Sequence, residues 1–131
     1  RGLLGLGEPL APAREFPIEY REYTPGVGME WHDDEPIFDP PQLELVYTVE
    51  NSSDSVTRWS ESHLDVLQGN VGEVWTRPNS GLLVRAGGPV HMVSELGSGS
   101  RAIAKVVFSV GESPRLTRDG LRNLDMLRHL E

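Results

Sequence analysis

A histidine and an aspartate separated by one residue form the strongest chemical signal in this 131-residue chain. His32 and Asp34 come shortly after the turn-forming segment Thr24-Pro25-Gly26. Residues i and i+2 of an extended strand point to the same face, so this imidazole and carboxylate would converge on one point. One further histidine would complete a set of two histidines and one carboxylate, which holds a non-haem Fe(II) and leaves coordination positions open.

The spacing alone leaves the other two ligands open. His91 follows a Gly-Gly-Pro-Val turn and precedes two apolar residues, whereas His63 lies in a polar stretch that is expected to be a loop. Asp33 should face away from His32 in a regular strand, but a slip of one residue in the register would bring Asp33 to the metal in place of Asp34. The sequence therefore predicts a metal site around His32 with His91 as the obvious third ligand.

Composition narrows the classes of function. The net charge is −8 and no cluster of Lys and Arg occurs, so binding to nucleic acid phosphate is not expected. The chain has no cysteine, which excludes disulfides, thiolate metal sites and a cysteine nucleophile. No apolar run approaches the length of a membrane-spanning helix, so no transmembrane segment is expected. We expect a soluble protein of the cytoplasm or of an organelle matrix, and no sequence feature distinguishes these two locations.

Alternating apolar residues and frequent turn residues predict one all-β domain over residues 16–112. The expected strands cover 16–23, 43–49, 56–59, 71–75, 82–84 and 101–110. Residues 60–70 are ambiguous, with one helical turn as an alternative to a loop.

The two ends of the chain differ from this domain. Residues 1–15 are rich in Gly and Pro and predict an extended arm that carries Leu3, Leu4, Leu6 and Leu10. Residues 113–131 predict a helical tail with Thr117 or Asp119 as its N-cap and an apolar stripe of Leu121, Leu124, Leu127 and Leu130. These apolar residues could pack on the chain's own domain. Alternatively, exposed apolar surface marks an interface, so a protein partner could bind residues 1–13 or 117–131.

Arg101 opens the otherwise apolar strand 101–110. A charged group whose stem enters a core needs a partner, and a planar guanidinium binds a carboxylate through two parallel hydrogen bonds. Lys105 shares the face of Arg101 in a regular strand and is a weaker candidate for the same role. The alternative is an arginine at a strand end that is exposed to solvent.

Six of these residues occur in an order that carries a family resemblance: Tyr23, Gly26, His32, Asp34, His91 and Arg101. The set, which spans roughly residues 16–110, resembles the 2-oxoglutarate and Fe(II)-dependent oxygenases, especially their prolyl-hydroxylase-like branch. The separation of His91 from Arg101 matches the family pattern and favours His91 over His63 as the third ligand.

The resemblance implies a double-stranded β-helix, a jelly-roll or cupin-like barrel, and the short C-terminal helix predicted within residues 113–131 would follow it. It implies Fe(II) bound by His32, Asp34 and His91, and 2-oxoglutarate held through its distal carboxylate by Arg101. Tyr23 and Thr48 would lie beside this cosubstrate. The implied activity is that of a hydroxylase, which couples decarboxylation of 2-oxoglutarate to oxidation of a small-molecule or peptide substrate.

Two other functions remain open at the level of sequence. The barrel could keep its ligands and serve as a non-catalytic accessory subunit of a larger assembly. It could also be a metal-free jelly-roll binding module. Release of succinate separates the enzyme from both.

Overall fold

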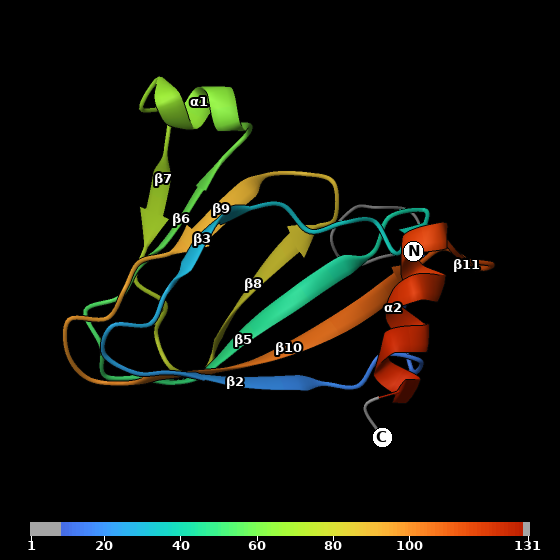
Figure 1. The fold of residues 1–131 in the computed structure, drawn as a ribbon, viewed down its shortest axis with the longest axis horizontal. Helices are drawn as coiled ribbons and strands as arrows, with labels where there is room; N and C mark the ends of the chain where they lie inside the picture. Colours follow the sequence, from blue (N-terminus) through green and yellow to red (C-terminus); the bar gives the residue numbers. More distant parts are fainter. Residues whose placement is uncertain (1–8, 130–131) are drawn as a thin grey trace.

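The computed structural model describes residues 9–129 and shows a mostly β protein with two main sheets and a C-terminal helix (Figure 1). The elements in chain order are β1 (Leu10–Pro12), β2 (Glu19–Tyr23), β3 (Met29–His32), β4 (Phe38–Asp39), β5 (Leu43–Asn51), β6 (Thr57–Ser60), α1 (His63–Leu67), β7 (Gly72–Val74), β8 (Ser80–Arg85), β9 (Val90–Val93), β10 (Arg101–Val110), β11 (Arg115–Leu116) and α2 (Arg118–His129).

The larger sheet is organised around β10, the longest strand. β10 pairs antiparallel with β5 on one side, and β5 pairs with β8. On its other side, β10 pairs with β2 through its first half and with β1 through its second half. β5 and β10 are rich in β-branched and aromatic residues, which pack well on a pleated surface.

The smaller sheet has the order β3-β9-β6-β7 and lies over one face of the larger sheet (Figure 1). All its pairs are antiparallel. The short helix α1 connects β6 to β7 and begins at Ser62, whose side chain accepts a hydrogen bond from the backbone N–H of Asp65. This bond satisfies one of the free N–H groups at the start of the helix.

The helix α2 lies across the end of the larger sheet (Figure 1). It follows a two-stranded ladder of β4 and β11. The Thr117 hydroxyl accepts a hydrogen bond from the Gly120 N–H at 3.0 Å, so Thr117 rather than Asp119 is the N-cap. A Cβ at Gly120 would lie 2.1 Å from the carbonyl oxygen of Ile37, and a glycine is therefore required for the helix to approach this backbone so closely.

Two clusters of buried side chains stabilise the domain. One joins Ala13, Ile37 and Phe38 beneath the start of α2. The other joins Leu96 to Tyr23 and Ile103 of the larger sheet. The second cluster lies beside the cation Arg101, so the packing that closes the sandwich also fixes the surroundings of this charge.

The expectation of an all-β chain with a short C-terminal helix is confirmed. The predicted strand 101–110 coincides with β10, and the predicted strand 43–49 extends to Asn51. The predicted strand 16–23 is shorter, because only Glu19–Tyr23 pairs with β10. Residues 60–70 contain the helical turn α1. Neither described helix combines the length and the apolar content needed to cross a membrane.

The predicted arm and tail are only partly described. Leu10 lies in β1, which pairs with the end of β10, so this part of the arm belongs to the chain's own sheet. In α2, Leu124 and Leu127 are half-buried, whereas Leu121 is exposed. The predicted positions Leu3, Leu4, Leu6 and Leu130 lie outside the described residues. A protein partner at either end stays a prediction.

Candidate metal centre

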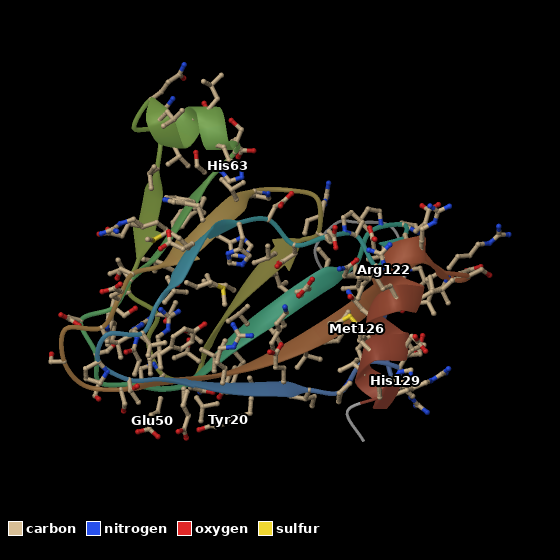
Figure 2. The ribbon with its side chains drawn as sticks, in the orientation of Figure 1. Tyr20, Glu50, His63, Arg122, Met126 and His129 are labelled. Atoms are coloured by element: carbon tan, nitrogen blue, oxygen red, sulfur yellow. The ribbon has the colours of Figure 1, made fainter. Side chains whose placement is uncertain are left out.

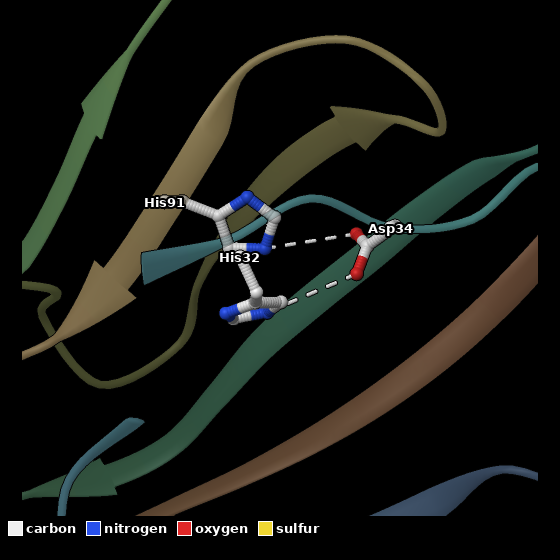
Figure 3. A group of neighbouring side chains, drawn as sticks. All are labelled: His32, Asp34 and His91. Carbon is white, nitrogen blue, oxygen red and sulfur yellow. Dashed lines mark ion pairs between the residues drawn. The ribbon is translucent and has the colours of Figure 1, made fainter. Parts of the chain in front are cut away.

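Two neighbouring strands of the smaller sheet bring the candidate ligands together. His32 ends β3, and His91 lies on β9 as its direct partner in the ladder. Directly opposite residues on paired strands project from the same face. Asp34 follows β3 two residues after His32 and turns its carboxylate toward both rings (Figure 3). The predicted convergence of His32, Asp34 and His91 is present in the structure.

The donor atoms of these three side chains lie within 4.8 Å of one another. The Asp34 carboxylate presents Oδ1 at 3.9 Å from the His32 Nε2 and Oδ2 at 3.7 Å from the His91 Nε2. Ligand atoms about 2.1 Å from a metal and at right angles to one another lie about 3 Å apart, so small side-chain rotations would complete the coordination. The three side chains could hold a metal ion.

Backbone hydrogen bonds orient both imidazole rings. The His32 Nδ1 lies 2.8 Å from the carbonyl oxygen of Glu30, and the His91 Nδ1 lies 3.3 Å from that of Pro89. A carbonyl oxygen only accepts, so Nδ1 carries the proton in each neutral ring and Nε2 keeps its lone pair. Such outer contacts fix the tautomer of metal-binding histidines. Both rings are thus prepared to donate through Nε2.

The alternatives that the sequence left open fall outside this cluster. Asp33 is exposed and does not belong to the group, so Asp34 is the carboxylate of the cluster. The pairing of β3 with β9 is itself irregular between Met29 and His32. His63 is exposed at the start of α1, and His129 is exposed on α2 (Figure 2). Of the four histidines in the chain, His32 and His91 are therefore the pair that converges.

The cluster opens into a cavity of about 700 Å³ between the two sheets. Apolar side chains of both sheets form much of its wall, among them Met29, Val46, Leu82, Val84 and Val93. Charged side chains of β2 and β10 also line it: Glu19, Arg21, Arg101 and Lys105. A mainly apolar cavity with a few convergent polar groups is the usual form of a small-molecule site.

Arg101 lies in this cavity and is 2% exposed. Its Nη1 donates to the Ser55 hydroxyl at 3.3 Å and its Nη2 donates to the Thr57 hydroxyl at 2.8 Å. Its Nε is buried and has no hydrogen-bond partner among the described residues. No ion pair joins Arg101 to a carboxylate in residues 9–129. Burial lowers the pKa of this guanidinium, which the nearby Tyr23 partly offsets, and the group still carries its charge at neutral pH.

Of the two further candidates for the cosubstrate site, Tyr23 and Thr48, only Tyr23 lines the cavity. Tyr23 lines the cavity, and its ring centroid lies 5.8 Å from the Arg101 guanidinium carbon. Thr48 is 1% exposed and pairs with Ile103 in the sheet, but it is not among the residues that line the cavity. The hydroxyl beside Arg101 belongs instead to Thr57.

Sequence reasoning missed Ser55 and Thr57 as partners of Arg101. They lie on either side of Val56, and this i, i+2 spacing places two hydroxyls on one face at the start of a strand. That spacing is the local signal that could have identified them. Their pairing with Arg101 is a long-range contact between the two sheets, so the sequence pattern alone did not indicate it.

Lys105 faces the same cavity as Arg101, as expected from their spacing, but it already has a partner. Its Nζ lies 2.7 Å from the Glu44 Oε1, and the Glu44 side chain is 5% exposed. Burial lowers the pKa of Lys105, but the Glu44 carboxylate, with Asp34 and Glu19, raises it more, so the pKa lies above its ordinary value. Arg101 is therefore the better site for an external anion.

Comparisons with models of protein families, with curated proteins and with solved structures find no match to this chain.

Proposed function

We propose that this chain is an Fe(II)- and 2-oxoglutarate-dependent oxygenase of the hydroxylase type, built on a double-stranded β-helix. The observation that carries the proposal is the combination of two features in one cavity. Three potential metal ligands line it on the side of the smaller sheet, and Arg101, buried and without a carboxylate partner in residues 9–129, lines it from the larger sheet.

The strand order supports the proposed barrel. In chain order, the larger sheet takes β2, β5, β8 and β10, with the short β1 added beside the second half of β10, and the smaller sheet takes β3, β6, β7 and β9. The chain thus passes repeatedly between the sheets, and both have the same kind of order, β2-β10-β5-β8 and β3-β9-β6-β7. Eight antiparallel strands that alternate in this way are typical of a jelly-roll.

The donor set supports Fe(II). Two imidazoles and one carboxylate suit this ion and leave positions free for a bidentate cosubstrate and for O₂. When bound, the iron would supply the oxidative chemistry that couples 2-oxoglutarate decarboxylation to substrate oxidation. Asp34 and the imidazoles of His32 and His91 would hold it on one side, facing a cavity whose lining is largely apolar.

Arg101 supports a dicarboxylate cosubstrate. A buried charge is costly unless it is paired. Among residues 9–129 no carboxylate pairs with Arg101 and its Nε has no hydrogen-bond partner, so a ligand could compensate the charge. A carboxylate at this guanidinium would complete the charge balance, with Thr57 and Ser55 fixing the guanidinium plane. The other end of a dicarboxylate could then reach the metal ligands in the same cavity.

Anaerobic titration calorimetry tests this arrangement. The expected result is one 2-oxoglutarate bound per Fe(II)-loaded chain, with much weaker binding when the metal is omitted. Glutarate, which lacks the keto oxygen needed to chelate the metal, is the matched ligand and should bind with little dependence on the metal. Equal binding of both compounds with and without Fe(II) would contradict the proposal.

A further inference from the structure

Trp59 has an unusual position for a large apolar side chain. It lies on β6, lines the cavity, and is 42% exposed. It is the direct ladder partner of the ligand His91 on one side and of Gly72 on the other. Its side chain therefore projects from the same face of the smaller sheet as the metal cluster.

Gly72 determines how the indole lies. A Cβ at this position would be 2.3 Å from the Cε2 and Cζ2 atoms of Trp59 and 2.8 Å from its Nε1. Any other residue would displace the ring, so the absence of a side chain at Gly72 lets the indole lie flat against the backbone of β7. The ring is thereby held by the edge of the sheet, and one side of it remains open to the cavity.

The larger sheet contributes several apolar side chains to the cavity. Val46 on β5 and Leu82 and Val84 on β8 line the same cavity from the inner face of the larger sheet. Together with the indole they form the apolar part of a lining to which Lys105, the ladder partner of Val46, also belongs. A planar uncharged ring would bury its faces between aromatic and aliphatic surfaces there.

We propose that Trp59 is a stacking platform that positions a planar aromatic group of the substrate beside the metal centre. That the bound ring belongs to a molecule oxidised at the metal centre rests on the proposed oxygenase function. The binding of the ring itself depends only on the cavity.

The position of the indole has a consequence for the site of oxidation. The strand order β3-β9-β6-β7 puts Gly72 and His91 on opposite sides of Trp59. A ring stacked on the indole therefore lies beside the metal ligands rather than directly over them. The carbon presented to the metal would belong to a group attached to the ring.

Binding of two matched compounds tests the platform. The probe is 2-naphthol, and its control is decahydro-2-naphthol, which has the same carbon skeleton and hydroxyl but no aromatic ring. We expect the full chain, without added metal or 2-oxoglutarate, to prefer 2-naphthol. Trp59→Leu should weaken 2-naphthol binding about tenfold, the size of one lost stacking contact.

Trp75→Leu is the control variant. Trp75 is also 42% exposed, but it is not among the residues lining the cavity, and its Nε1 donates to the Ser53 carbonyl oxygen. This variant should bind 2-naphthol as the unaltered chain does. In the unaltered chain, addition of 2-naphthol should shift the Trp59 indole N–H resonance, a readout that needs no folded variant.

Equal binding of both compounds, or an unshifted Trp59 resonance at saturating 2-naphthol, would overturn the platform. Succinate release reports on the proposed function alone, so the failure of one proposal is distinguishable from the failure of the other.

Discussion

His32 and His91 are direct partners across β3 and β9, and their ring centroids lie 4.3 Å apart. Each ring contacts the carbonyl oxygen of the residue two positions before its own through Nδ1, Glu30 for one and Pro89 for the other. The same local hydrogen bond, to the carbonyl oxygen two residues earlier, thus favours the same tautomer for both histidines on adjacent strands. This repetition prepares two Nε2 atoms for one ion before any ion binds.

Removal of the His91 imidazole should abolish tight metal binding. We expect His91→Ala to weaken Fe(II) binding by more than about 100-fold, because loss of a ligand exceeds the 10–100-fold typical for loss of an outer contact. Anaerobic calorimetry measures this affinity. His63→Ala is the matched control, since His63 is exposed on α1 and lies outside the cluster. Equal losses in the two variants would contradict the assignment.

The neighbouring aspartates offer a sharper comparison. Asp34→Asn should reduce Fe(II) affinity strongly, because an amide oxygen is a weaker ligand and the negative charge is lost. Asp33→Asn removes the same charge one residue away and should leave the affinity nearly unchanged, since Asp33 does not belong to the cluster. If Asp33→Asn caused the larger loss, the assignment of Asp34 as the ligand would be wrong.

Arg101 should control the affinity for 2-oxoglutarate. Arg101→Ala should weaken its binding to the Fe(II)-loaded chain by about 2–5 kcal/mol, the range for truncating one member of a buried charge pair. Because a ligand that binds only the folded state stabilises it, 2-oxoglutarate should raise the Tm of the unaltered chain and not that of the variant.

Arg115→Ala is the control for that experiment, because Arg115 is exposed on β11, outside the cavity. A normal 2-oxoglutarate-dependent rise in Tm for Arg101→Ala would place the cosubstrate elsewhere.

The ion pair of Lys105 and Glu44 predicts a loss of stability at alkaline pH. The pKa of Lys105 is raised above its ordinary 10.5 by Glu44, and burial opposes this rise. A raised pKa in the folded state stabilises the protein below the ordinary value, and this contribution is lost as the pH increases through the folded pKa. The free energy of unfolding should therefore fall above pH 10.5.

Urea denaturation at a series of pH values measures this loss. The double variant Lys105→Met/Glu44→Gln removes both charges and leaves no carboxylate unpaired, so it should show a smaller decrease over the same range. The single variant Lys105→Met should be destabilised by about 3 kcal/mol, because it leaves the Glu44 carboxylate buried without its partner. Identical pH profiles for the unaltered chain and the double variant would show that the pair contributes nothing.

Local sequence patterns predicted the parts of the fold that depend on local physics. The largely apolar run of β10 and the segment Leu-Val-Tyr-Thr-Val of β5 predict long strands without reference to the rest of the chain. The i, i+2 spacing of His32 and Asp34 likewise predicted their convergence from the alternation of side chains along a strand. In the structure β3 ends at His32, and Asp34 reaches the ring from the segment that follows.

Contacts between distant segments could not be predicted in the same way. Nothing near Arg101 indicates that the hydroxyls of Ser55 and Thr57 hold its guanidinium. Thr48 was expected beside the cosubstrate, but it is 1% exposed and is not among the residues that line the cavity, although its ladder partner Ile103 is. The role of Gly72 under the Trp59 indole also depends on the pairing of β6 with β7, which the sequence does not specify.

Turnover of 2-oxoglutarate tests the central claim most directly. The purified chain with Fe(II), ascorbate and O₂ should convert 2-oxoglutarate to succinate and CO₂ in equal amounts, slowly even without a substrate. Asp34→Asn should abolish this conversion and Asp33→Asn should retain it. A chain that binds Fe(II) and 2-oxoglutarate but releases no succinate would be an accessory subunit. A chain that binds neither would be a metal-free module. Either result would contradict the proposed oxygenase activity.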